Sequence, residues 1–426
     1  MNENDEETRF NPLLAILIAL FGSTSWLGVN AFWVEMSVHT QTLPEGWHLG
    51  SILTIIIQIS SIPALIYTLL DHKNRIKIST APIIELALVI VAIAILLVGH
   101  FNDFTVEIGG SKRSIVVYIC MFFVGSVSIL SDVLFIPYMK NLPAAYFQAF
   151  FVGLGMSALM PSIFSIIQGA SSYECVVVPG EAQRPPRFIA PLFTVEVFYF
   201  IVFCWYCIGL VAFILIHHKR RWIFNVWPER LTWRIGSAGY HDNKEAVATK
   251  TWNGRSDVLL LTMIAIVYSL ISVLMPSIQS YVALPYSPQT YSWSLTLCAI
   301  IQPVGSFISF FAPLRKIPLM VVTCCLTVLS AMFCLTLAFQ SPSPWLVGTT
   351  AGSVSVILLT MTVFGLGCYT RSVIFEYIQS SSPSPAATHR RLLYAGLVGQ
   401  AGTVVGTIFV FPAVNIFNLF KSAPSC

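Results

Sequence analysis

Two tryptophans and an asparagine recur on one side of the first hydrophobic stretch of the chain. Trp26, Asn30 and Trp33 are spaced four and three residues apart, which places them on one face of an α-helix. Two aromatic rings can stack on a flat molecule, and the amide between them both donates and accepts hydrogen bonds. The alternative is that these tryptophans only anchor the helix at a membrane surface. Glu35 joins the same site if the helix unwinds there, and otherwise stands in water near the helix end.

A second polar position is Asp132, in the apolar run GSVSILSDVLFIPYMK. It precedes Lys140 by eight residues, about 12 Å along a helix, which is too far for a short side chain to reach water at that end. Pro137 interrupts the helix ladder and frees backbone carbonyl groups. Asp132 is therefore a candidate ligand for a substrate and a candidate proton carrier, with a structural role as the alternative.

Polar side chains also interrupt two hydrophobic stretches in the second half of the chain. One stretch ends in the polar run MPSIQSYVALPY, and the next carries the run IIQPVGSF. An amide presents a donor and an acceptor together, which suits the edge of a uracil-like or lactam ring. The same groups could instead join helix to helix, a contact worth under about 1 kcal/mol. The candidates in this half are Gln279, Ser280, Tyr281 and Gln302.

The composition requires that these residues lie in a membrane protein. Of the 426 residues, 56% are hydrophobic and only 10% are charged, whereas a soluble domain carries about a quarter charged residues. Soluble enzymes, nucleic-acid binders and disordered scaffolds are thereby excluded as descriptions of the whole chain. The sequence contains no Walker loop and no HExxH motif, so primary pumping and zinc proteolysis lack support. We expect neither an enzyme nor a resident cofactor.

Long stretches without charge predict eleven transmembrane helices and hence an all-α fold. The two longest run from Asp257 to Arg315 and from Lys316 to Arg371; each is too long for one crossing and fits two helices joined by a turn. The N-terminus is acidic and lacks the basic region of a cleavable signal peptide. The predicted spans are 11–34, 49–70, 80–100, 114–139, 144–170, 191–217, 257–281, 289–312, 317–340, 346–371 and 391–416.

The distribution of Lys and Arg predicts the orientation of these spans. With the N-terminus in the cytoplasm and the C-terminus outside, 18 of the 23 basic residues fall on the inner side, as the positive-inside rule requires. Arg371 and Glu376 then stand near span ends, where we expect contact with water. A long basic loop, 218–256, is expected to lie on anionic lipid. It separates six spans in 1–217 from five in 257–426, the layout of transporters built from two packed bundles.

Most of the ten cysteines fall in apolar stretches, where a thiol acts as a small hydrophobic group. Cys204 and Cys207 have CxxC spacing but no polar ligands beside them, so we predict no metal site. Cys175 and Cys426 both fall outside the cell in this topology, where disulfides persist, and they could form a bridge.

Several of the polar stretches resemble the eukaryotic riboflavin transporter family, solute carrier family 52. The resemblance rests on FGSTSWLGVNAFWVEMSV, LPEGWHL, the run from VLFIPYMK to SSYEC, LMPSIQSYVALPY, WLVGTTAGS and AGLVGQAGTVVGTIFVFP. It implies eleven spans, a cytoplasmic N-terminus, a fold similar to equilibrative nucleoside transporters and major-facilitator bundles, and facilitated or proton-influenced riboflavin uptake at the plasma membrane. Glu35 matches an acidic position associated with substrate recognition. Asp132 and Leu154 depart from the family pattern, which has Asn and Gln there.

With this resemblance, the sequence predicts a secondary transporter that works by alternating access. Riboflavin has a flat ring that suits aromatic faces and amides, and a hydroxylated chain that suits Ser, Asn and Gln. Its expected partners are riboflavin, the lipid bilayer and, where uptake is proton-influenced, protons, without nucleic acid or an obligate protein partner. The alternatives are a carrier of nucleosides or other neutral heterocycles, and a membrane receptor or channel. In the site, Trp26, Asn30 and Trp33 would bind the ring, Glu35 would lie at the outer mouth, Asp132 and Gln302 would lie deeper, and Gln279, Ser280 and Tyr281 would lie opposite them.

Overall fold

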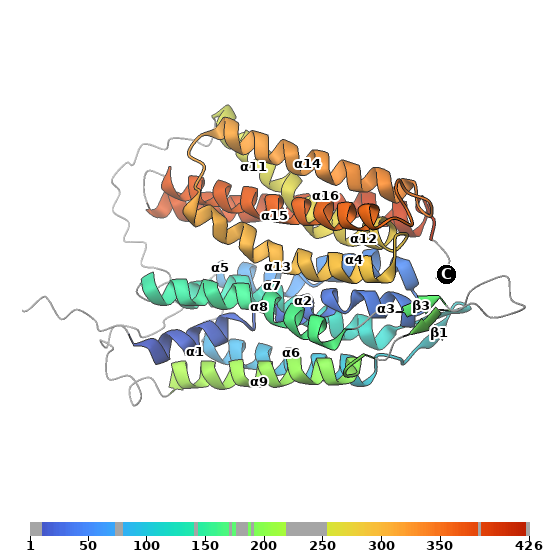
Figure 1. Ribbon diagram of the computed structural model, residues 1–426. Helices are drawn as coiled ribbons and strands as arrows, with labels where there is room; N and C mark the ends of the chain where they lie inside the picture. The colour runs from blue at the N-terminus through green and yellow to red at the C-terminus, as the bar shows by residue number, and fades with distance from the viewer. Residues whose placement is uncertain are drawn as a thin grey trace, which may run out of the picture.

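The computed structural model is built almost entirely of helices that run roughly along one axis (Figure 1). It describes residues 11–72, 80–139, 144–169, 173–175, 186–188, 191–218, 254–381 and 385–422. Within these residues, nine helices are long and apolar enough to cross a membrane, and a bent pair raises the number to ten. Each of the eleven predicted spans overlaps a helix.

The helices fall into two groups along the chain. The N-terminal group comprises α1 (Pro12–Gly22), α2 (Leu27–Val34), α3 (Met36–Thr42), η1 (Gly46–His48), α4 (Leu49–Ile59), α5 (Ile62–His72), α6 (Thr80–His100), α7 (Ile115–Met139), α8 (Ala144–Gln168) and α9 (Val195–His218). The C-terminal group comprises α11 (Arg255–Ser269), η2 (Leu270–Leu274), α12 (Met275–Ala283), α13 (Pro288–Phe311), α14 (Ile317–Phe339), α15 (Thr350–Ser380) and α16 (Pro385–Asn415). Most of the loop 218–256 lies outside the described residues.

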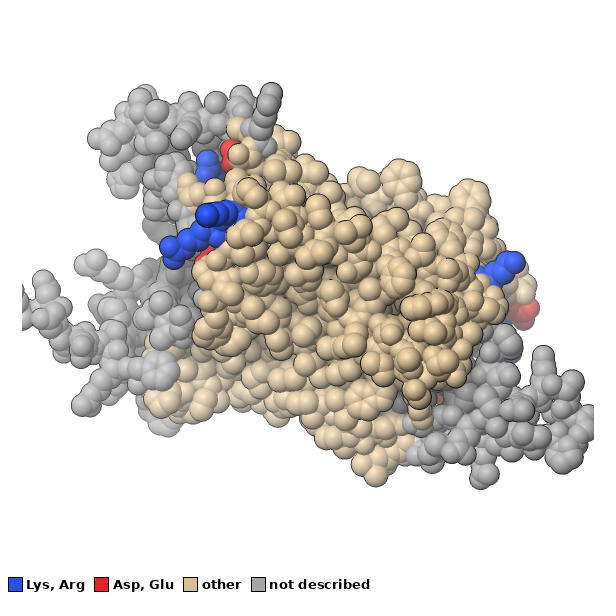
Figure 2. Space-filling model, turned by 45° about the horizontal axis from the view of Figure 1, so that its top comes forward, with Lys and Arg blue, Asp and Glu red and all other residues tan. Residues whose placement is uncertain are grey.

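Large apolar side chains cover the outside of the helices. On α6, for example, Leu86 and Ile93 are exposed while Leu88 and Ile95 are buried. Figure 2 shows the same pattern over one face, where charged residues gather at two opposite ends of an uncharged belt. A water-soluble protein does not expose apolar surface on this scale, so the belt is the surface that faces lipid.

The first predicted span, 11–34, is not one helix. It breaks between α1 and α2 with a bend of 57°, so the prediction of a continuous helix there was wrong. The break follows from the local sequence GSTS. Ser23 donates its hydroxyl to the carbonyl of Leu20 at 2.7 Å, and Thr24 donates to that of Phe21 at 2.7 Å. Such bonds compete with the backbone ladder and end the helix.

The seventh predicted span is disturbed at Pro276 but remains one span. A π-helical turn, η2, precedes the proline, and Pro276 then occupies the first turn of α12. A proline in the first turn of a helix costs no backbone hydrogen bond. The wider π-helical turn before Pro276 therefore accommodates the proline, and the helical span continues. Pro276 thus disturbs this span only locally.

Two short antiparallel hairpins lie at one end of the bundle, so the fold is not purely α-helical. One pairs β1 (Val106–Ile108) with β2 (Ser111–Arg113), and the other pairs β3 (Tyr173–Cys175) with β4 (Pro186–Phe188). Figure 1 shows β1 and β3 together at this end. We call it the hairpin end, and the opposite end, where α9 stops and α11 starts, the linker end.

The two groups meet along a seam that is closed toward the hairpin end. There α4 packs on α12 and α16, and α13 packs on α2, α3 and α8; Figure 1 shows α4 and α13 between the groups. Gly50 approaches α12 so closely that an added Cβ would lie 2.4 Å from the carbonyl oxygen of Pro276. Asn415 donates to Ser51 at 2.8 Å across the same seam. Helix α5, which follows α4 in the chain, packs instead on α7 of its own group.

Candidate functional site

The break in the first span positions Trp26. The residue is the N-cap of α2 rather than part of its interior, and its indole N–H donates to Oδ1 of Asp132 on α7 at 3.1 Å. Trp26 is half-buried, and the side chain of Asp132 is exposed although it lies seven residues inside the linker-end terminus of α7. The sequence named both residues separately, and the structure brings them into contact.

Asn30 and Trp33 follow on α2 and are also half-buried. Asn30 donates its amide to the hydroxyl of Ser157 on α8 at 3.3 Å, and Ser157 donates to the carbonyl of Leu154 at 2.7 Å. Trp33 packs against the apolar core with part of its surface accessible. The helix face predicted from the spacing of Trp26, Asn30 and Trp33 therefore starts at the N-cap of α2, and it presents two indole rings and one amide.

Glu35 lies between α2 and α3, just past the first span, and is completely buried. Neither carboxylate oxygen has a hydrogen-bond partner among the described residues; the hydroxyl of Ser165 on α8 lies beside it. Burial raises the pKa of Glu35 to about 8 because the charged form loses its hydration. Because Glu35 is buried, the alternative of a carboxylate standing in water was wrong. Its backbone keeps helical dihedral angles at the junction of α2 and α3, and its place in the site stays a prediction.

His39, one turn after Glu35, is a buried polar residue that the sequence analysis missed. Its Nε2 shares a hydrogen bond with the hydroxyl of Tyr199 on α9 at 2.7 Å, and its ring stacks on Phe32 at 4.4 Å. Burial lowers the pKa of His39 to about 3, so the ring is neutral at pH 7. A histidine four residues after a glutamate in a helical stretch is the signal that could have found it.

The candidates on α12 lie in the seam rather than beside Trp26. Ser280 donates its hydroxyl to the carbonyl of Trp47 at 3.0 Å, and the hydroxyl of Tyr281 shares a hydrogen bond with His48 at 3.3 Å. Gln279 donates to Ser294 on α13 at 3.2 Å. All three are buried. The contacts of Ser280 and Tyr281 join the two helix groups at the hairpin end, and that of Gln279 lies within the C-terminal group.

Gln302 lies where α13 crosses α8. It is half-buried, and the next residue, Pro303, would be 3.5 Å from a Cβ added to Gly155 on α8. The small residue and the proline let these two helices approach closely at mid-length. The amide of Gln302 therefore stands near the middle of the seam, in the part of the molecule that also holds Asn30 and Ser157.

Arg371 and Tyr268 are two further polar residues of the seam that the sequence analysis did not select. The predicted span ended at Arg371, but α15 continues for nine more residues to Ser380, so the expected position at a water-facing span end was wrong. The guanidinium lies over the Tyr268 ring on α11, 5.5 Å from its centre. Arg371 is only half-exposed, and Asp132 of the other helix group is a carboxylate in charge interaction with it. The uninterrupted helical pattern after Arg371 is the signal that could have shown this.

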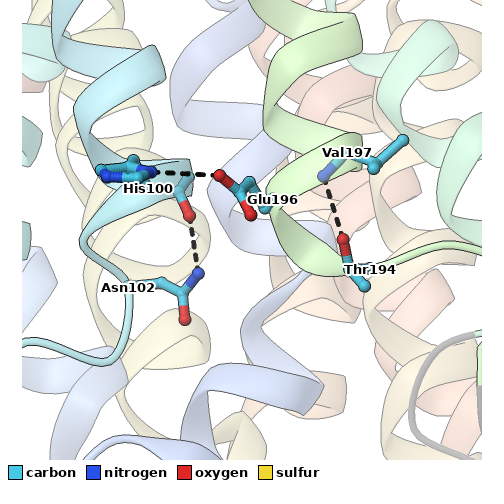
Figure 3. Close-up of polar contacts among 6 residues, drawn as sticks. His100, Asn102, Thr194, Glu196 and Val197 are labelled. Carbon is cyan, nitrogen blue, oxygen red and sulfur yellow. Dashed lines mark hydrogen bonds and ion pairs between the residues drawn. The ribbon is translucent and has the colours of Figure 1, made fainter.

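A separate polar cluster lies on the outside of the molecule at the hairpin end (Figure 3). Nδ1 of His100 on α6 lies 3.1 Å from Oε1 of Glu196 on α9, with both side chains largely exposed, beside a surface hollow of about 390 Å³. The hydroxyl of Thr194 accepts from the N–H of Val197 at 3.3 Å and so caps α9. These contacts fasten helix ends, and the cluster is remote from the seam.

The described residues contain no group of three or more His, Cys, Asp or Glu that could hold a metal ion. Cys204 and Cys207 are free thiols on α9. The predicted bridge between Cys175 and Cys426 falls outside the described side chains and stays a prediction.

Comparison with known proteins finds relatives over nearly the whole chain. A family model described as "Solute carrier family 52, riboflavin transporter" matches residues 10–422. Riboflavin transporter rft-1 of Caenorhabditis elegans is 32% identical over 428 residues, covering 96% of this chain and 98% of that protein. The human solute carrier family 52 member 3, a riboflavin transporter, is 28% identical over 466 residues, covering 97% and 98%.

The fold is similar to those of solved secondary transporters. The crystal structure of a D-xylose–proton symporter superposes with a TM-score of 0.60 at 15% identity, covering 95% of this chain and 90% of that one. A POT family transporter gives 0.56 at 14% identity, with 96% and 91% covered. The likeness therefore extends over nearly the whole fold, and at this level of identity it concerns the fold alone.

Proposed function

The chain belongs to the riboflavin transporter family of solute carrier family 52, and from this premise we propose that it carries riboflavin across a membrane as a secondary transporter. The observation that supports this most directly is the contact of Trp26 with Asp132 at the break in the first span. It sets an indole, a carboxylate and the amide of Asn30 beside the seam between the helix groups. Substrate sites of such carriers lie between the bundles, where helices are discontinuous.

The residues at the seam suit the two parts of riboflavin. Trp26 and Trp33 offer aromatic faces to the flat ring, and Asn30, Ser157 and Gln302 offer donors and acceptors to its edge or to the hydroxylated chain. Gln279, Ser280 and Tyr281 contribute on the hairpin side when the seam opens. Glu35 then lies beyond the ring, toward the hairpin end. The substrate is neutral, so the membrane potential does not drive it.

The proposed topology has eleven crossings, with α8 as the eleventh beside the nine apolar helices and the bent pair. Six lie in 1–217 and five in 257–426, joined by the cytoplasmic loop 218–256. The linker end then faces the cytoplasm together with the N-terminus, and the hairpin end and the C-terminus face outward at the plasma membrane. With the seam closed at the hairpin end, the arrangement is an inward-facing state of alternating access.

Protons are a proposed second partner, and Glu35 and Asp132 are the carboxyl groups that would carry them. Support comes from the burial of Glu35 without a hydrogen-bond partner in the described chain. Riboflavin uptake is measured in vesicles at outer pH 5.5, 7.5 and 9 with the wild type and the double variant Glu35→Gln, Asp132→Asn. The wild type is expected to lose uptake as pH rises. An identical pH dependence in the double variant would remove protons from the proposal.

The experiment that tests the function is uptake of labelled riboflavin by purified protein in liposomes. Unlabelled lumiflavin should compete and nucleosides should not; the reverse result would make the chain a nucleoside carrier of the same fold. Trp33→Ala should lower uptake at least fivefold, since one stacked ring is worth about 1–3 kcal/mol. The matched control is Trp345→Ala, an exposed tryptophan between α14 and α15, which should leave uptake unchanged. Liposomes that show no riboflavin uptake at all would overturn the proposal.

A further inference from the structure

Two opposite charges from the two helix groups face one another inside the molecule. Asp132 lies seven residues before the end of α7, and Arg371 lies nine residues before the end of α15. With 1.5 Å per residue, these positions are about 10 Å and about 14 Å from the linker end. Each side chain acts electrostatically on the other. The two charges thus meet at similar depth across the seam.

Both side chains are held in place by aromatic neighbours. The indole N–H of Trp26 donates to Oδ1 of Asp132, which fixes the carboxylate against the break in the first span. The Tyr268 ring lies under the guanidinium of Arg371, and such stacking orients the planar group. Arg371 and Asp132 both retain accessible surface. They are therefore fixed but not enclosed.

The pair has hydrogen-bonding capacity left for a ligand. A carboxylate offers about four acceptor sites and a guanidinium offers five donors. The described contacts use one oxygen of Asp132, and the face of Arg371 and its hydrogen bond with the side chain of Tyr268. A charged pair inside a membrane bundle is costly and marks a functional pathway by default. The carboxylate of Asp132 is an acceptor, and the guanidinium of Arg371 beside it is a planar donor. Together they are complementary to a ligand edge on which a donor stands next to an acceptor.

The imide edge of a flavin ring has this pattern, because its N3–H donor stands between two carbonyl acceptors. We propose that Arg371 is a substrate-binding residue that reads this edge together with Asp132. The inference rests on the proposed riboflavin transport and names the part of the substrate that the site recognises. Asp132 accepts from N3–H, Arg371 donates to the adjacent carbonyl, and Trp26 lies at the ring. Since the two residues belong to different helix groups, the bound edge joins the groups and favours closure around the substrate.

The test compares riboflavin with its N3-methyl derivative, which lacks the N3–H donor but keeps the ring and the hydroxylated chain. Uptake of each is measured in liposomes with wild type, Asp132→Asn, Arg371→Gln and Arg371→Lys. The wild type should favour riboflavin at least tenfold, because the methyl compound leaves the charged acceptor of Asp132 unpaired once the seam closes around it. Asp132→Asn should reduce that preference to about threefold or less, and Arg371→Gln should lower riboflavin uptake at least tenfold. Arg371→Lys should restore only part of it, since a lysine lacks the planar donor pair.

Controls separate this inference from the proposed function. Arg315→Gln, at an exposed arginine between α13 and α14, should transport like the wild type. If Arg371→Gln does not fold, the nearly isosteric Asp132→Asn still reports the preference. A wild type that carries both compounds equally overturns the inference while leaving riboflavin transport intact. An Asp132→Asn variant that lowers uptake of both compounds by the same factor also overturns it, because a purely structural role of Asp132 has that effect. A wild type that carries neither compound overturns the proposed function itself.

Discussion

Two buried carboxylates stand ten residues apart after the first span, and their surroundings are opposite. Glu45 accepts hydrogen bonds from the backbone N–H of Ser114 at 2.8 Å, from its hydroxyl at 3.0 Å and from the hydroxyl of Tyr118. Glu35 accepts none within the described residues. A carboxylate with three donors fastens the start of α7 to the loop before α4. A buried carboxyl group without a hydrogen-bond donor lowers the free energy of unfolding, and such groups are typical of functional positions.

The largest effect is expected at the partnered carboxylate. Glu45→Ala leaves three donors without an acceptor, and we expect it to lower the free energy of unfolding by about 3 kcal/mol. Heat stability is followed by the loss of the monodisperse protein peak in detergent. Ser114→Ala, which removes only one of the three bonds, should cost about 1 kcal/mol. If Glu45→Ala is as stable as the wild type, the network does not fasten α7 and the contrast with Glu35 disappears.

The next-largest effect is expected at His39, near the carboxyl group of Glu35. This histidine should make the free energy of unfolding depend on pH in the acid range. Its pKa falls from 6.5 to about 3 on folding, so the unfolded chain binds more protons between these values. Stability must then fall as pH drops below about 6.5. Between pH 7 and pH 5 the loss is about 2 kcal/mol for this one group. His39→Gln should remove most of that loss in a thermal shift series. An unchanged acid dependence would show that His39 is not held neutral.

Glu35→Gln tests the other side of the comparison. The pKa of Glu35 rises from 4.5 to about 8 on folding, so the folded chain binds more protons there and stability falls as pH increases between these values. The variant should remove this alkaline loss and keep or improve heat stability at pH 8, while riboflavin uptake falls about tenfold, or about 1.4 kcal/mol. Reduced stability at pH 8 with normal uptake would give Glu35 the same role as Glu45.

The comparison of Glu35 with Glu45 also bears on how much of the structure could be predicted from the sequence. Charge-free stretches predicted where helices run, because apolar length is what a bilayer demands of a span. They could not show the bend at Ser23 and Thr24, since those hydroxyls add no charge, or the continuation of α15 past Arg371. Spacing grouped Trp26 with Asn30 and Trp33. It could not show that Glu35 is buried, that Asp132 contacts Trp26 or that Asp132 interacts electrostatically with Arg371. The last two interactions join segments about a hundred or more residues apart.

The smallest effect is expected where two neutral partners share one bond. The hydroxyl of Tyr281 and His48 lie 3.3 Å apart across the seam, so Tyr281→Phe should cost only about 0.5–1 kcal/mol of stability. That is less than the charged network of Glu45, whose acceptor bears a full charge. Because the bond helps to close the hairpin end, its loss should also raise labelling of a cysteine placed at Ser51 in the seam by about two- to fivefold, as expected for so small a shift. Tyr291→Phe, at a buried tyrosine on α13, is the matched control and should alter neither quantity. A loss as large as that of Glu45→Ala would show that closure of the seam, rather than charge pairing at Glu45, carries most of the stability of this end.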